Sequence, residues 1–132
     1  MNEIFIDSNI ILYLMDANDH KRSIAQNLLL QKPLINAQIL TEVANVCKRR
    51  FKYDKDQVVQ LWIDLLTDCI FVETTKSTFF NSIELVKKYN FQIFDSLIVS
   101  SALNSNCTIL YSEDMQHGMK VDNRLSIINP FI

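Results

Sequence analysis

Glycine and proline are scarce in this sequence of 132 residues, which contains one glycine and two prolines. A single glycine excludes the Walker phosphate-binding loop and the G-x-G-x-x-G dinucleotide motif, because each of them needs at least two. No segment rich in proline, glycine or serine divides the chain, and 48% of its residues are hydrophobic. We therefore predict one compact domain over residues 1–132 with a single hydrophobic core.

The sequence also lacks an excess of basic residues, a cysteine motif and any long hydrophobic run. The formal net charge of -2 argues against binding nucleic acid through overall charge, but it leaves room for a local basic patch. Cys47, Cys69 and Cys107 show no C-x-x-C or Cys/His spacing, which predicts buried free thiols in a reducing compartment. No run reaches the length of a membrane span, and the N-terminus has no basic region typical of a signal peptide. We expect a soluble, cytoplasmic protein that does not bind a membrane.

Residues for nucleophilic catalysis are equally sparse. The only histidines are His20 and His117, and no G-x-S-x-G turn is present. These absences argue against a Ser/His/Asp or Cys/His active site.

The most informative stretch is at the N-terminus, where three apolar residues precede Asp7, Ser8 and Asn9. Such a run predicts a short strand buried on both faces, as in the centre of a parallel sheet, with Asp7 at its carboxyl end. Ser8 or Asn9 would cap a helix from Ile10 to Met15. Taken alone, Asp7 is better explained as a helix cap, but three further acids occur in similar settings.

Helical and strand patterns alternate along the rest of the chain. Helical spacing covers residues 20–30, about 13 residues around 39–47, 56–66 and 79–89, and a last helix opens at Asp95. Short apolar runs at 33–36, 70–72, 108–111 and 125–128 predict strands. This alternation predicts an α/β fold with a mainly parallel sheet covered by helices on both faces.

Four acids are predicted to meet at the carboxyl edge of that sheet. Asp7 and Asp114 end strands, Asp95 begins a helix, and Glu42 lies early in a helix that follows a strand. Four gathered carboxylates repel one another unless cations neutralise them, and Mg²⁺ or Mn²⁺ prefer such oxygen ligands. The pattern favours metal-dependent cleavage of a phosphodiester. Individually, Asp95 could be only a helix cap and Glu42 only a surface charge.

These motifs together resemble the PIN-domain proteins of the VapC-like toxin class, the endoribonucleases of type II toxin–antitoxin pairs. The resemblance is carried, in chain order, by Ile4–Asn9, Gln38–Glu42, Phe94–Val99, Leu110–Gly118 and Asn129–Phe131. It implies a PIN-like three-layer α/β/α sandwich with a mainly parallel sheet of about five strands, forming a single PIN domain. It also maps the family's acids onto Asp7, Glu42, Asp95 and Asp114. Ser112 matches the hydroxyl residue beside the last acid, and Asn9 a polar position near the pocket.

The resemblance implies a Mg²⁺- or Mn²⁺-dependent endoribonuclease that cleaves single-stranded or loop RNA and is inhibited by a cognate antitoxin. Asp7, Asp95 and Asp114 would hold the metal directly or through water, and Glu42 would complete the shell or orient the attacking water. One alternative is a haloacid-dehalogenase-like phosphatase, although that chemistry usually requires a second acid at the position of Asn9. Another is a non-catalytic PIN scaffold that binds RNA or a protein.

Two further segments suggest partners. Residues 48–53 contain four cations and two aromatic residues; Arg49 and Arg50 could grip RNA, or simply complement the helix dipole. The segments 22–30 and 56–66 are more apolar than contact with a sheet requires, with Leu29 and Trp62 among their large side chains. They predict either a groove for an antitoxin helix or a homodimer interface, with ordinary core packing as the alternative.

Overall fold

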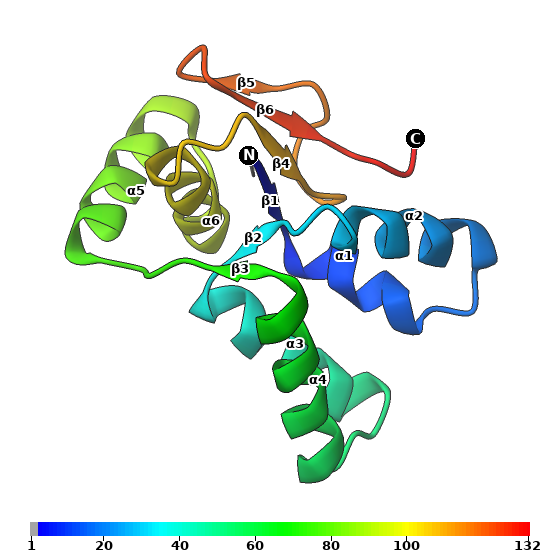
Figure 1. The fold of residues 1–132 in the computed structure, drawn as a ribbon. Coiled ribbons are helices and arrows are strands. Elements are labelled where there is room, and N and C mark those ends of the chain that lie inside the picture. Colours follow the sequence, from blue (N-terminus) through cyan, green and yellow to red (C-terminus); the bar gives the residue numbers. More distant parts are fainter. Residues whose placement is uncertain (1–2) are drawn as a thin grey trace.

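In the part of the chain that the structure describes, six strands form one sheet in the order β3-β2-β1-β4-β6-β5 (Figure 1). The computed structural model describes residues 3–132; Met1 and Asn2, the start of the predicted domain, lie outside them. The strands are β1 (Ile4–Ile6), β2 (Leu34–Ile35), β3 (Ile70–Phe71), β4 (Ile109–Tyr111), β5 (Lys120–Val121) and β6 (Leu125–Ile128). All neighbouring pairs are parallel except β5 and β6. The mainly parallel sheet of the prediction is confirmed, and β5 is an additional edge strand.

Helices cover the sheet on both sides, with α5 and α6 to one side and α1 and α2 to the other (Figure 1). The helices are α1 (Ser8–Leu12), α2 (Asp19–Leu29), α3 (Ala37–Arg50), α4 (Lys55–Asp68), α5 (Lys76–Tyr89) and α6 (Ile93–Asn104). The 3₁₀ turn η1 (Tyr13–Met15) continues α1. The three-layer α/β/α sandwich is therefore confirmed.

Two predicted helix starts are wrong. The N-cap of α1 is Asp7, not Ser8 or Asn9, because the Asp7 side chain accepts a hydrogen bond from the backbone N–H of Ser8. Helix α6 begins at Ile93, so Asp95 lies in its first turn and is not its cap. Asp95 is thereby free of the capping role that sequence alone allowed.

The core is built on the central strands and on α6. Phe5, Ile6 and Leu110 are fully buried in β1 and β4. Helix α6 buries residues around most of its circumference, as expected for a helix enclosed by other elements. Its serines find partners: Ser100 Oγ donates to the carbonyl of Thr78 at 2.7 Å, and Asn36 Nδ2 donates to Ser101 Oγ at 2.9 Å. The helix that carries Asp95 is thus fixed by both packing and hydrogen bonds.

Asparagine and aspartate take most of the left-handed backbone positions in this glycine-poor chain. Among residues 3–132, six non-glycine residues have positive φ, and Asn90, Asn106, Asp122 and Asn123 are four of them. These residue types tolerate this conformation best after glycine. Asp122 and Asn123 form the turn of the β5–β6 hairpin.

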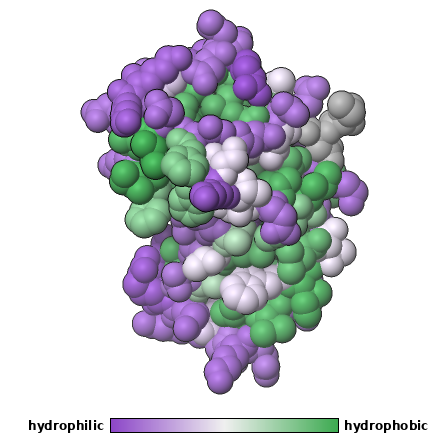
Figure 2. Space-filling model, turned by 90° about the vertical axis from the view of Figure 1, so that its left-hand side faces the viewer, coloured by the Kyte–Doolittle hydropathy of each residue, from purple (hydrophilic) through white to green (hydrophobic). Residues whose placement is uncertain are grey.

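Helix α4 leaves an apolar face uncovered. Val59, Ile63 and Leu66 are each about half exposed, and Trp62 is 37% exposed although its indole N–H donates to the carbonyl of Leu40. Figure 2, which views the molecule from the left-hand side of Figure 1, shows hydrophobic areas in the upper and lower parts of that face. A hollow of about 350 Å³ separates α4 from α2, and its lining includes Leu29, Leu30, Leu61 and Leu65. The two helices therefore line a groove. No helix within residues 3–132 is long and apolar enough to cross a membrane.

Candidate active site

Asp7 is the most deeply buried of the four predicted acids. Its Oδ1 accepts from the backbone N–H of Ser8 at 2.8 Å, and its Oδ2 accepts from Ser112 Oγ at 2.9 Å. The pKa of Asp7 is raised to about 6: burial is the largest cause, the two hydrogen bonds oppose it, and the nearby carboxylates of Glu42 and Asp95 add a smaller increase. Asp7 is therefore a carboxyl group poised to gain or lose a proton near neutral pH.

Glu42 is held between α1 and α3. Ser8 Oγ donates to Glu42 Oε2 at 2.8 Å, and Gln38 Nε2, one helical turn earlier, donates to Glu42 Oε1 at 2.9 Å. The same Gln38 nitrogen also donates to the carbonyl of Phe94 at 3.1 Å. Ser8 directly follows Asp7, and Phe94 directly precedes Asp95. These bonds therefore link Glu42 to the backbone next to Asp7 and next to Asp95.

Asp95 and Asp114 complete the group. Asp95 is half-buried in the first turn of α6, and its pKa is raised by burial first and then by the charges of Asp114 and Glu42. Asp114 is exposed in the loop after β4. The charges of Glu42 and Asp95 thus act on Asp7, and those of Glu42 and Asp114 act on Asp95, so the structure brings the four predicted acids into one region.

Asn9 and Ser112 hold the loop after β4 in place. Asn9 Oδ1 accepts from the backbone N–H of Glu113 at 3.2 Å, while Asn9 Nδ2 donates to Asp114 Oδ2 at 3.1 Å. Ser112 is fully buried and, besides donating to Asp7, accepts from the backbone N–H of Met115 at 3.4 Å. Both residues therefore contact the acids directly.

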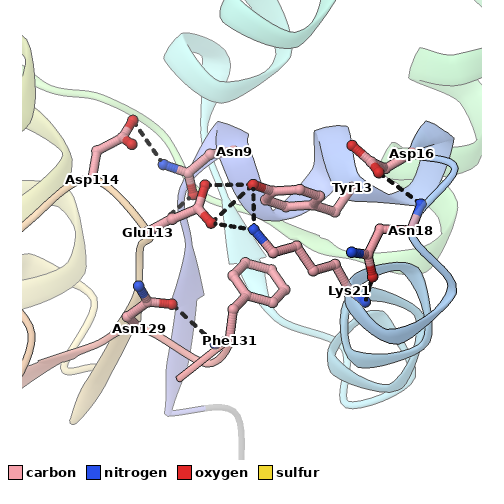
Figure 3. A network of polar contacts seen from close by, with 9 residues as sticks. All are labelled: Asn9, Tyr13, Asp16, Asn18, Lys21, Glu113, Asp114, Asn129 and Phe131. Atoms are coloured by element: carbon pink, nitrogen blue, oxygen red, sulfur yellow. Dashed lines mark hydrogen bonds and ion pairs between the residues drawn. The ribbon is translucent and has the colours of Figure 1, made fainter.

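A second network, which the sequence did not reveal, supports the same loop (Figure 3). Tyr13 lies four residues after Asn9, and its hydroxyl donates to Glu113 at 2.7 Å. Lys21 Nζ, from α2, lies 3.1 Å from both the Tyr13 hydroxyl and Glu113 Oε2. The Phe131 ring packs edge-on against Tyr13 with centroids 4.7 Å apart. Asn9 of α1 and Tyr13 of η1 thus contact two consecutive acids. Lys21 pairs with Glu113, whereas Asp114 forms no ion pair within the described residues.

Of the two predicted arginines, Arg50 reaches the neighbourhood of the acids. Arg50 lines a hollow of about 250 Å³ together with Tyr13, Phe51 and Asp114. Its guanidinium also lies 5.2 Å from the centroid of the Phe51 ring. Arg49 is exposed in the last turn of α3 and is not among the residues that line this hollow.

Comparison with known families identifies the domain. The PIN domain profile matches residues 4–118, which is most of the chain and includes all four acids. The chain belongs to the PIN-domain family. No curated protein sequence matches it significantly.

Solved structures with the same fold are distant in sequence. A toxin–antitoxin complex from Klebsiella pneumoniae has a TM-score of 0.74 at 14% identity, covering 96% of this chain and 97% of the other. VapC20 of Mycobacterium tuberculosis, described as a sarcin-ricin loop cleaving toxin, has a TM-score of 0.68 at 19% identity, covering 84% and 89%. VapBC2 from Rickettsia felis, bound to a DNA fragment from its promoter, has a TM-score of 0.68 at 18% identity, covering 94% and 96%. At these identities the likeness shows that this PIN domain shares their fold.

The residues at this PIN site fit a hydrated divalent cation. None of the ion pairs found among residues 3–132 involves Asp7, Glu42, Asp95 or Asp114, so the protein leaves these charges uncompensated. Within residues 3–132, no group of three or more His, Cys, Asp or Glu side chains is close enough to enclose a metal ion by itself. Mg²⁺ does not require this, because it keeps several waters and binds through one or two carboxylates. In addition, Gln38 Oε1, beside Glu42, is buried without a hydrogen-bond donor among the described residues and could accept one from such a water.

Proposed function

We propose that this PIN domain is a Mg²⁺- or Mn²⁺-dependent endoribonuclease and the toxin of a toxin–antitoxin pair. The observation that carries the proposal is the group of four neighbouring carboxylates whose charges raise the pKa of Asp7 and Asp95, and none of which forms an ion pair within residues 3–132. The PIN-domain membership also removes the haloacid-dehalogenase-like phosphatase from consideration, and Asn9 engages Asp114 instead of supplying a second acid.

The side chains divide the work of phosphodiester hydrolysis among them. Asp7, Asp95 and Asp114 would hold the cation, which lowers the pKa of a bound water and stabilises the charge on the leaving oxygen. Glu42, fixed by Ser8 and Gln38, has no freedom to turn away and would orient the attacking water. The hydrogen bond from Ser112 keeps Asp7 aligned and favours its ionised form despite burial.

The proposed substrate is single-stranded or loop RNA, with Arg50 contacting its backbone. Arg50 and the aromatic rings of Tyr13 and Phe51 line the hollow beside Asp114, a combination of cation and rings that suits an unpaired strand. The VapC20 structure, with the same fold, is of a toxin described as cleaving the sarcin-ricin loop.

The proposed inhibitor is an antitoxin whose amphipathic helix occupies the groove between α2 and α4. Leu29, Leu61 and Leu65 line this groove, and Val59 and Ile63 extend the apolar surface along α4. Such a surface suits a helix with anchors at i, i+3, i+4 and i+7. Toxin–antitoxin complexes are among the structures that share the fold. A homodimer formed through the α4 face is the alternative use of the same surface.

Replacing Asp95 by asparagine tests the nuclease assignment. We expect single-stranded RNA cleavage in Mg²⁺ to fall by about 10²-fold or more, because one metal-holding carboxylate is lost from a site that supplies several kcal/mol of transition-state stabilisation. Far-UV circular dichroism should be unchanged. The matched control, Asp56→Asn, alters an exposed acid in the first turn of α4 and should cleave normally.

The outcome that contradicts the proposal is equal cleavage by the Asp95→Asn variant and the wild type. Activity that survives excess chelator would remove the metal from the proposal. RNA binding without any cleavage by the wild type would instead identify a non-catalytic PIN scaffold.

A further inference from the structure

A second hollow adjoins the acids and is not used by the proposed mechanism. It measures about 240 Å³ and is lined by the α5–α6 connection, by Asp95 and by the loop after β4. Asp114 lines both this hollow and the one that contains Arg50. Any group bound in the second hollow is therefore next to the acids that would hold the metal.

The lining of this hollow differs in chemistry from the Arg50 side. It presents three side-chain amides, those of Asn90, Gln92 and Gln116, and no lysine or arginine. All three residues are exposed, and Gln92 stands at the N-cap of α6 without capping it. A surface with amide groups and no cation is suited to a neutral group that both donates and accepts hydrogen bonds, and it is poorly suited to a phosphate.

Aromatic rings and methionines complete the lining, and one of the rings is firmly held. Tyr89 and Phe91 have ring centroids 5.7 Å apart. The Tyr89 hydroxyl donates to Asp122 Oδ1 at 2.8 Å and accepts from the backbone N–H of Asp122 at 2.8 Å. The ring is thus anchored to the β5–β6 turn and needs no further ordering to act as a platform.

We propose that this hollow binds one unpaired nucleobase of the substrate, next to the phosphodiester that is cut, and that its amides read the edge of that base. Aromatic and apolar side chains stack on unpaired bases, and amide side chains hydrogen-bond to their edges. The hollow is then a specificity site, whereas Arg50 on the other side of Asp114 contacts the backbone. This inference rests on the proposed nuclease function. It adds the place in the structure that determines which RNA sequence the nuclease prefers.

Cleavage of a randomised single-stranded RNA pool tests the assignment. The full chain cuts the pool in Mg²⁺, and sequencing of the new ends gives the base preference at each position around the cut. We expect a preference at one position directly flanking the cut in the wild type. Gln116→Ala and Gln92→Ala should each flatten that preference by about tenfold, because one base-edge contact is lost, and should leave preferences elsewhere unchanged.

Two variants sharpen the experiment. Asn90 has the left-handed φ of 59°, so Asn90→Gly removes the amide while keeping the backbone, and it should flatten the same position. The matched control Gln31→Ala changes an exposed amide outside the hollow and should leave the profile intact. A wild type that cleaves without any flanking preference, or amide variants with the wild-type profile, would overturn this inference alone. An uncut pool would overturn the nuclease proposal and this inference together.

Discussion

In metal-free protein, replacing Asp7 by asparagine should lower the free energy of unfolding at low pH and raise it at pH 7.5. The pKa of Asp7 is about 6 in the folded protein against 3.8 for an unperturbed aspartate. Between these values the folded state holds a proton that the unfolded chain has lost, so wild-type stability falls as the pH rises through this window. Above about pH 6 the loss is complete. It amounts to about 3 kcal/mol for this carboxyl group.

Asparagine cannot ionise, but it has one acceptor oxygen where Asp7 has two. One of the donors, Ser8 N–H or Ser112 Oγ, then loses its acceptor, which costs about 1 kcal/mol. At pH 3, where Asp7 is largely protonated in both the folded and the unfolded state, the variant should therefore be less stable than the wild type by about 1 kcal/mol. At pH 7.5 it should be more stable by about 2 kcal/mol, since the desolvation of the charged carboxylate is removed.

Urea unfolding at a series of pH values, in the presence of chelator, measures this difference. A gain of about 2 kcal/mol corresponds to an increase of roughly 1–2 M in the urea midpoint. Asp56→Asn, at an exposed acid, is the matched control. If Asp7 holds the metal as proposed, added Mg²⁺ should stabilise the wild type more than the variant, because the variant lacks the ionised carboxylate. A difference between Asp7→Asn and wild type that stays constant from pH 3 to 7.5 would refute the reasoning.

Two further predictions concern the loop after β4 and the exposed face of α4. Tyr13→Phe keeps the ring against Phe131 but removes the hydrogen bond to Glu113, so it should lower stability by about 1 kcal/mol and cleavage several-fold, with metal affinity barely altered. Unchanged single-turnover cleavage would contradict this positioning role. Trp62→Ala should weaken antitoxin binding or dimerisation at least tenfold, since partly exposed tryptophans often anchor interfaces, while Trp62→Phe should do so less. This prediction would be contradicted if the wild-type protein sedimented as a monomer and also bound no antitoxin.

The positions of Asp7 and Asp114 were predictable because they depend on where strands end. A run such as Ile4–Ile6 followed by Asp7 marks a strand terminus, and parallel strands bring their termini to one edge. The supporting residues were harder to identify. Gln38 lies one turn before Glu42, a spacing at which helical side chains interact, so a local signal for it existed. Lys21 had no such signal, because its contact with Glu113 depends on how α2 packs against η1.

The same distinction holds for the fold. Long, periodic segments such as α3 were predicted nearly to their ends, because an apolar stripe identifies a helix wherever it packs. Strand β5 was missed because it has only two residues and is stabilised by pairing with β6. The consecutive Asp122 and Asn123 were the available hairpin signal. The first turn of α6 was also misplaced, since no side chain caps it.

The hydrogen bond between Asp7 and Ser112 joins residues 105 positions apart in the chain. A nascent polypeptide that has not yet extended beyond β4 therefore has only part of the acidic group, and its first strand lacks a central neighbour. Contacts of such long sequence separation form late, because a large loop must close first. The acids therefore come together only in a nearly complete domain. If the chain is the proposed nuclease, no cutting activity can precede the synthesis of β4 and the loop that follows it.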